Sequence, residues 1–367
     1  MTDVVVYYHD PVKAPLLRDA VLPALAAATR VADVTGHLER HWLQGPHLRI
    51  RLRGPVEAQA AAAAAAAAVL REYVRTHPST VDIPEHELLS HAYEASIAEL
   101  LKPPFEPLHP NNSVRIEVTD TRRIRDLLGS DVLVGLRATG LRLGVPAVAA
   151  STAEFGETSE ERVRLAVTAM AVHAGRYPPG LGNGYHSFLS HVEDFLLAAD
   201  SGGRIRAKFG RVWADNAASV VETVRRVAGG NPTTEAEAAW QAWTIGTRLA
   251  VERAFDAGDL PSGPNPRYGE RAHELGDPGA IQRYDYAERT RFSEYHTKLW
   301  DVDLDHPLIR KPLTVYRFGT NVLYQLLALC DVTPMERYLA ASLVAAATQR
   351  LTGINWDEHL SALAGLR

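Results

Sequence analysis

The clearest alternation of apolar and polar positions in this chain lies between His47 and Arg53. One side of an extended segment takes Leu48, Ile50 and Leu52, and the other side takes three arginines and a histidine. The pattern therefore predicts a β-strand with one core face and one cationic face. A Gly-Pro pair at 45–46 predicts a turn just before it.

Other segments complete a predicted α+β fold. β-branched and apolar residues predict strands at 4–9 and 113–118, and an alanine-rich run favours a helix over 57–74. Apolar spacing predicts the remaining helices at 16–28, 85–101, 160–172, 187–199, 211–227, 235–255, 312–328 and 335–351. We expect an antiparallel or mixed sheet packed with helices over 1–150, and a mainly helical part over 151–367. The two parts are alternatively one continuous domain.

Two local signals refine this picture. Thr333-Pro334, followed by Glu336, predicts a helix start, because threonine caps, proline fits the first turn and a carboxylate favours the dipole. Residues 258–279 are rich in Gly and Pro, which predicts a long loop of the kind that serves as a binding lid or stays disordered.

Composition excludes several classes of protein. A formal charge of -5 gives no general attraction to nucleic acid or to an anionic membrane. Cys330 is the single cysteine, so there is no internal disulfide framework. The longest apolar run, 60–70, is too short to span a bilayer, and the start of the sequence does not resemble a signal peptide. We therefore expect a cytoplasmic protein without a membrane or nucleic-acid partner.

Common cofactor and catalytic motifs are missing from the sequence. Neither GxxxxGK[ST], GxGxxG, HExxH nor GxSxG occurs. His186 and His191 are five residues apart, which places them on different sides of a helix. We predict no metal site and no required cofactor.

A resemblance gives the row of arginines a functional meaning. The segment 42–52 resembles the HLRxRL signature of the C-terminal elimination domain of lantibiotic dehydratases, whose stand-alone relatives work in thiopeptide biosynthesis. Segments 184–195, 333–338 and 349–353 agree with the same family. The competing explanation of the arginine row is an ordinary solvated face of a sheet.

The departures from this family are informative. The family's important arginines carry over to Arg49 and Arg51, but the position of a further catalytic arginine falls on Glu99. An essential histidine late in the family is missing from 342–347, where Ala345 stands. The resemblance therefore implies a pyridine synthase: an enzyme that joins two dehydroalanines of a leader-bearing peptide by a formal aza-[4+2] cycloaddition, with loss of water and of the leader.

Such a reaction needs positioning and modest proton transfer rather than a cofactor. As catalytic residues we expect Glu94 with Tyr93 as an acid/base or orienting pair, and Tyr295, Ser293 and His296 for later proton transfers. As substrate-binding residues we expect Arg49, Arg51, Trp42, His191 and His186. Each also has an ordinary structural explanation: a solvated carboxylate, a packed aromatic ring or a satisfied histidine.

Two other functions remain open from the sequence. A stand-alone glutamate-elimination subunit of a split tRNA-dependent dehydratase would need the arginine and histidine that Glu99 and Ala345 replace. A non-catalytic family member would only bind the modified peptide. In each case the expected partner is a leader-bearing precursor peptide, with azoles and dehydroalanines in the case of the synthase.

Overall fold

The chain forms two compact units in a computed structural model that describes residues 1–155, 158–261 and 266–366. Unit 1 comprises 1–145, 265–289 and 328–331, and unit 2 comprises 146–264, 290–327 and 332–367. The first boundary lies close to residue 150, where the sequence pattern changes. Two short segments from the second half of the chain return to unit 1, and the sequence pattern gives no sign of them.

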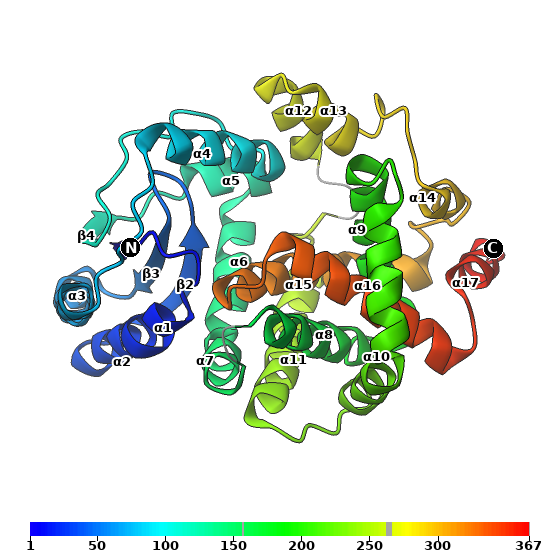
Figure 1. The fold of residues 1–367 in the computed structure, drawn as a ribbon, viewed down its shortest axis with the longest axis horizontal. Helices are drawn as coiled ribbons and strands as arrows, with labels where there is room; N and C mark the ends of the chain where they lie inside the picture. The colour runs from blue at the N-terminus through cyan, green and yellow to red at the C-terminus, as the bar shows by residue number, and fades with distance from the viewer. Residues whose placement is uncertain (156–157, 262–265, 367) are drawn as a thin grey trace. The chain divides into compact units, whose positions relative to one another are not determined.

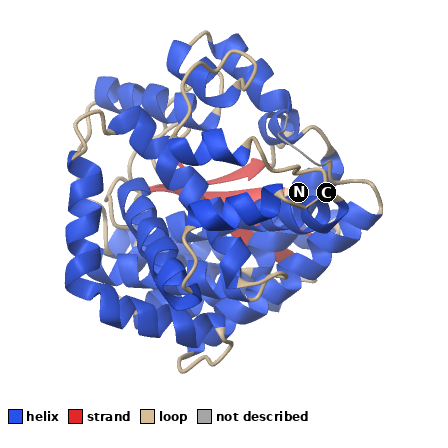
Figure 2. Ribbon diagram, turned by 90° about the vertical axis from the view of Figure 1, so that its right-hand side faces the viewer, coloured by secondary structure: helices blue, strands red, loops and turns tan. Residues whose placement is uncertain are grey.

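A four-stranded antiparallel sheet forms the centre of unit 1, with strand order β2-β3-β1-β4. The strands are β1 (Thr2–Tyr7), β2 (Thr35–His41), β3 (His47–Arg53) and β4 (Ser113–Val118). The three predicted strands are confirmed, and β2 is an addition. Helices make up most of the remaining ribbon (Figure 2).

The alternation in β3 sorts the two faces of this sheet as expected. Leu48, Ile50 and Leu52 are buried, and they lie opposite Val6, Val4 and Thr2 of β1. Helices η1 (Leu17–Val21), α2 (Leu22–Val31) and α3 (Val56–Thr76) cover this apolar face. Figure 1 shows α3 beside β4. Four alanines of α3 are completely buried, and their small side chains let the helix lie close to the sheet: Ala62, Ala63, Ala66 and Ala67.

The predicted loop at 258–279 is wrong over most of its described length. Helices α12 (Pro266–Leu275) and α13 (Pro278–Tyr284) occupy this region, while residues 262–265 lie outside the described part. Asp277 caps α13 by accepting from the backbone of Ala280 at 2.8 Å, and a proline follows at the first helical position. Pro266 and Pro278 begin these helices and Gly276 follows the end of α12, so they mark helix ends instead of an open loop.

Unit 2 is built around α16 (Pro334–Thr352), which packs against α8 (Ser159–Gly175), α9 (Leu181–Ala199) and α10 (Arg204–Ala228). Alanines on several sides of α16 are buried, so neighbouring helices approach it closely. Gly184 fixes the position of α9, because a Cβ atom there would lie 2.8 Å from Cα of Ala174 in α8.

The remaining helices complete the described chain. They are α1 (Ala14–Leu16), α4 (Glu85–Glu99), α5 (Arg122–Leu128), α6 (Asp131–Leu143), α7 (Val145–Glu154), α11 (Glu235–Asp256), α14 (Glu294–Leu299), α15 (Pro307–Leu329) and α17 (Trp356–Ala364). The helices predicted from apolar spacing are all present, although 16–28 is divided among α1, η1 and α2, and α9, α10 and α15 begin five to seven residues before their predicted starts.

Within the described residues, one helical stretch is long and apolar enough to cross a membrane by length and composition. It is Asp131–Glu154, with a mean hydropathy of 1.4 over its best window and 44% of that window buried inside the protein. The core helix of a soluble protein passes the same test, so this stretch alone does not indicate a membrane protein.

Candidate functional site

Three of the side chains expected to transfer protons lie at the start of α14, in unit 2. Ser293 is the N-cap residue, and its hydroxyl oxygen accepts from the backbone N–H of His296 at 3.3 Å. Ser293, Tyr295 and His296 are all buried. The cap fixes the direction in which the first turn of α14 begins, and two of these side chains reach α9.

The first contact with α9 runs through His186. The hydroxyl of Tyr295 lies 3.2 Å from Nδ1 of His186, and Nε2 of His186 lies 2.8 Å from Nδ1 of His359 in α17. Burial, and next the neighbouring His359, lower the pKa of His186 to about 3, so this imidazole is neutral at physiological pH. Burial also raises the pKa of Tyr295.

The hydroxyl of Tyr295 also donates to the backbone carbonyl of His186, at 3.3 Å. Burial lowers the pKa of His359 from its ordinary value, and a hydrogen bond with the backbone of Gly182 opposes that shift.

The second contact with α9 runs through Ser190, one helical turn after His186. The hydroxyl of Ser190 lies 2.9 Å from Nε2 of His296, and the hydroxyl of Ser293 lies 2.8 Å from Nδ1 of the same ring. An imidazole held between two hydroxyls can pass a proton between them, which is the arrangement that general acid–base catalysis uses. Ser190 is partly exposed, whereas His296 and Ser293 are buried.

We call these six side chains the α9/α14 cluster: His186, Ser190, Ser293, Tyr295, His296 and His359. His191, also expected at the site, points to another neighbour. Its Nδ1 lies 2.8 Å from the hydroxyl of Tyr324, over whose ring the guanidinium of Arg337 lies at 4.4 Å. His191 thus belongs to a separate contact between α9, α15 and α16.

The arginines of β3 lie on the polar face of the sheet in unit 1. Arg51 is buried and donates to both carboxylate oxygens of Asp3, at 3.0 and 3.1 Å, and to Glu39 at 3.4 Å. Glu39 also accepts from Arg137 of α6 at 2.7 Å and lies 3.1 Å from His37. Burial opposes ionisation of Glu39, but these cations keep its pKa well below the usual range.

Arg49 has a more open position than Arg51. Its side chain is 18% exposed, against 6% for Arg51, and its Nε lies 3.4 Å from the same Asp3. Trp42 follows β2 and packs edge-on against Phe105. The cationic row predicted from the alternation is present, but buried carboxylates on β1 and β2 balance much of its charge.

Glu99, the last residue of α4, stands where the resemblance places an arginine. It lies beside the end of β2. Its carboxylate is 3.6 Å from Nε2 of His41. Lost hydration raises the pKa of Glu99, and Trp42 beside it opposes that rise. Glu94 and Tyr93 lie elsewhere on α4 and are exposed, with 59% of Tyr93 accessible.

The sequence-predicted residues therefore fall into two groups. Tyr295, Ser293, His296 and His186 come together in unit 2, whereas Arg49, Arg51, Trp42, Tyr93 and Glu94 belong to unit 1. Ser190 and His359 also belong to this site, although they were not among the residues predicted from the sequence. The spacing of four residues between His186 and Ser190 is a signal for a shared helix face, but no local pattern marks His359.

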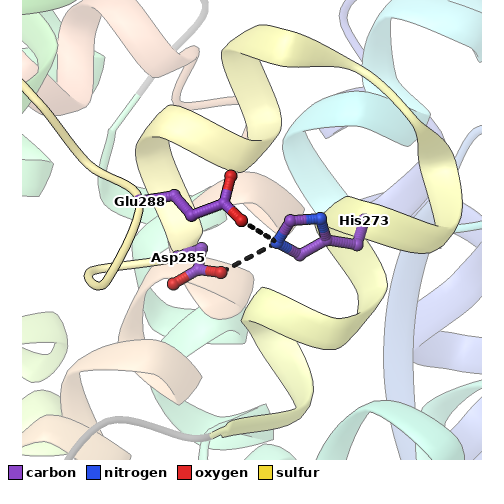
Figure 3. A group of neighbouring side chains, drawn as sticks. All are labelled: His273, Asp285 and Glu288. Atoms are coloured by element: carbon purple, nitrogen blue, oxygen red, sulfur yellow. Dashed lines mark hydrogen bonds and ion pairs between the residues drawn. The ribbon is translucent and has the colours of Figure 1, made fainter.

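A group of possible metal ligands lies in the 265–289 segment of unit 1. Nε2 of His273 is 2.8 Å from Asp285 and 3.7 Å from Glu288 (Figure 3). The ligand atoms of the three residues lie within 4.8 Å of one another, so they fit around a single ion. The direct hydrogen bond of His273 to Asp285 also accounts for their proximity without a metal.

Comparison with known proteins identifies the fold. No protein-family model and no curated protein matches the sequence. Among solved structures the chain is similar in fold to three proteins. One is TbtD, the pyridine synthase from thiomuracin biosynthesis: 22% of residues are identical, 96% of this chain and 98% of that chain are covered, and the TM-score is 0.71.

Two further structures are similar. TsrL is 16% identical, with 100% of this chain and 99% of that chain covered and a TM-score of 0.63. The tRNA-dependent lantibiotic dehydratase MibB from Microbispora sp. 107891 is 15% identical, with 96% of this chain and 28% of that chain covered and a TM-score of 0.43. The match to TbtD and TsrL confirms the α+β fold expected from the resemblance.

Proposed function

We propose that the protein is a pyridine synthase of thiopeptide biosynthesis. It takes a precursor peptide that carries a leader, azoles and two dehydroalanines, joins the two alkenes by a formal aza-[4+2] cycloaddition, and releases water and the leader as an amide. The observation that carries this proposal is the fold match to a pyridine synthase over 96% of this chain and 98% of that one. We place the reaction in the cytoplasm.

The environment of Ala345 supports this function over glutamate elimination. Ala345 is buried in one apolar cluster with Tyr185, Leu189 and Tyr295. The resemblance expects an essential histidine here, and an alanine cannot transfer a proton. At the other altered position, Glu99 offers a carboxyl group beside His41 where elimination would need an arginine for the leaving glutamate.

In this proposal the α9/α14 cluster handles protons during loss of water and of the leader. His296 connects the partly exposed hydroxyl of Ser190 with that of Ser293, so Ser190 is the member placed to meet the peptide. Tyr295 is 2% exposed and bonded to His186. It therefore holds α14 in place unless binding of the peptide uncovers it.

Arg49, Trp42, Glu94 and Tyr93 are proposed to bind and orient the peptide. Arg49 has the accessible guanidinium on β3, and hydrogen bonds from it to peptide carbonyls would hold the diene. Arg51 would act through Asp3, which both arginines contact. Folding one peptide so that two alkenes meet contributes up to roughly 7 to 11 kcal/mol to catalysis.

Mass spectrometry of a synthetic substrate tests the proposal. The purified protein is incubated, with no cofactor added, with a leader-bearing peptide that contains azoles and two dehydroalanines. A product that has lost water and the leader amide supports the synthase. Loss of glutamate from a glutamylated serine peptide instead would identify an elimination subunit, and binding without turnover of either would identify a carrier.

Paired variants then test the residues. Ser190→Ala and His296→Gln are expected to lower turnover by roughly 10² to 10⁴-fold, and Glu94→Gln to lower it as well. Tyr185→Phe is the control: this tyrosine is buried beside Tyr295, but its hydroxyl oxygen has no hydrogen-bond partner among the described residues. Unchanged turnover in both Ser190→Ala and His296→Gln would remove the cluster from the mechanism.

A further inference from the structure

The edge strand β4 is open on one side. It pairs only with β1, and in the described residues no other strand lies along its outer edge. Ile116 is 45% exposed and Val118 is 89% exposed. Proteins commonly protect such an edge with charged side chains, especially lysine, with proline or with a covering segment. Strand β4 has neither lysine nor proline, and its two charged residues, Arg115 and Glu117, have opposite signs. The edge can therefore pair with a strand whose charges are complementary to these two.

The ladder with β1 shows which backbone groups of β4 face outward. The N–H of Thr119 donates to the carbonyl of Met1 at 3.1 Å, so the pair 1 and 119 is hydrogen-bonded. Hydrogen-bonded pairs alternate in an antiparallel ladder. The backbone N–H and C=O groups of Ser113, Arg115 and Glu117 therefore bond to β1. The N–H and C=O groups of the alternate residues point away from the sheet: Val114, Ile116 and Val118.

The sequence of β4 is complementary to itself in one antiparallel register. With a two-fold axis at Ile116, that residue pairs with its own copy and Val114 pairs with Val118, so every outward backbone group meets a partner. Arg115 then lies opposite Glu117 of the other copy, in the closer non-hydrogen-bonded pairs with Cα atoms about 4.5 Å apart. Within one chain these two side chains already share a face and a 2.9 Å hydrogen bond.

Neighbouring registers are disfavoured by charge. The outward backbone groups can also hydrogen-bond when one β4 strand is shifted by two residues along the other. A shift one way places Arg115 opposite Arg115, and a shift the other way places Glu117 opposite Glu117. Like charges opposite one another destabilise a strand pair, so the register centred on Ile116 is the favoured one.

Helix α3, on the apolar face of the sheet, lies beside this edge and can contribute to contact between two copies. It packs against β4 (Figure 1), so a two-fold axis at β4 brings two copies of α3 to the same side of an eight-stranded sheet. The exposed positions of α3 include four alanines: Ala60, Ala61, Ala64 and Ala68. Their small side chains would allow close approach of the two helices.

We propose that two copies of this chain pair antiparallel through β4, in the register centred on Ile116. Charge complementarity selects the second copy over an unrelated extended peptide, because Arg115 and Glu117 satisfy one another across the axis. This inference is independent of the reaction proposed above, and it can stand or fall without it.

Sedimentation velocity of the full chain at roughly 1 to 100 µM tests the pairing. The wild type is expected to dimerise. Arg115→Glu places two like-charge pairs across the axis and is expected to weaken the dimer roughly tenfold or more. Glu117→Arg is expected to do the same. An equimolar mixture of these two single variants is expected to dimerise again. The Arg115→Glu chain carries glutamate at positions 115 and 117, and the Glu117→Arg chain carries arginine at both, so every pair across the axis has opposite charges.

A backbone variant gives a second test. The N–H of Ile116 faces outward, so Ile116→Pro removes the two hydrogen bonds that the Ile116 pair exchanges across the axis but none of the ladder with β1. It is expected to be monomeric with an unchanged circular dichroism spectrum. A wild type that stays monomeric across this range, or single charge variants that dimerise as tightly as the wild type, would overturn the proposal. Protection of β4 amides from hydrogen exchange only after addition of precursor peptide would assign the edge to that peptide instead.

Discussion

At the scale of single residues, Arg49 and Arg51 have different environments despite belonging to one motif. Both face the polar side of the sheet and both approach Asp3. Arg51 is also paired with Glu39, and its guanidinium is enclosed by protein. A buried cation between two buried carboxylates fixes the sheet, whereas Arg49 is the more accessible of the two arginines and contacts only one of these carboxylates.

Replacement of Arg51 should therefore act on stability first. Arg51→Met keeps most of the apolar stem but leaves Asp3 and Glu39 with less compensating charge, and we expect a loss of about 3 to 5 kcal/mol in the free energy of unfolding. Chemical denaturation monitored by circular dichroism measures this loss. The control is Arg53→Met, because Arg53 is exposed at the end of β3. Equal stability of the two variants would contradict the assigned role.

Sequence alone predicted the side to which each β3 residue points, but not what it meets there. Alternation fixes the faces of a strand. The partners of Arg51 lie 48 and 12 residues away in the chain, on β1 and β2, and nothing local indicates that pairing. The charge on the polar face therefore looked unbalanced from β3 alone, although the anions of β1 and β2 were present in the sequence.

At the scale of elements, local signals were reliable where they are complete. Thr333 and Glu336 form a reciprocal capping box at the start of α16, with the helix starting at Pro334 as the sequence predicts. By contrast, β2 escaped notice. Its residues include Gly36, Glu39 and two histidines, and Glu39 pairs with one of these, His37, on a buried polar face. No apolar alternation therefore marks β2 as a strand.

The capping box gives a test at this scale. Thr333→Ala removes the hydroxyl that accepts from the backbone N–H of Glu336, and we expect a loss of about 1 kcal/mol in stability. The matched control is Thr121→Ala, since Thr121 is the N-cap residue of α5 but makes no side-chain capping hydrogen bond. Urea unfolding should separate the two variants. The assignment fails if Thr121→Ala costs as much as Thr333→Ala.

At the scale of the whole chain, contacts between residues far apart in the sequence define the units. Residues 265–289 and 328–331 belong to unit 1 with the N-terminal 145 residues. Asp331 belongs to unit 1, where its carboxylate accepts from the backbone N–H groups of Lys13 and Ala14 at 2.7 Å each and pairs with Arg40. A side chain more than 300 residues away thus supplies the cap that α1 lacks locally. Hydrophobic periodicity describes short stretches of sequence, so it cannot predict a contact between residues this far apart.

Two buried carboxylates tie distant helices of unit 2 and make its stability depend on pH. Glu336 of α16 accepts from Arg162 and Ser159 of α8. Glu237 of α11 pairs with Arg226 of α10. Burial raises the pKa of each carboxyl, but the hydrogen bonds and ion pairs outweigh it and lower the pKa from 4.5 to about 2.

Because the folded-state pKa is the lower one, the stabilisation from each group is complete above pH 4.5 and is lost as the pH falls towards 2. Each group should contribute about 3 kcal/mol at neutral pH. We expect Glu336→Gln and Glu237→Gln to lower the melting temperature at pH 7 and to flatten its fall between pH 4.5 and 2. Glu235→Gln, an exposed control in the first turn of α11, should keep the wild-type slope. Scanning calorimetry at a series of pH values decides the matter, and a wild-type slope in both buried-site variants would show that other groups carry the acid sensitivity of unit 2.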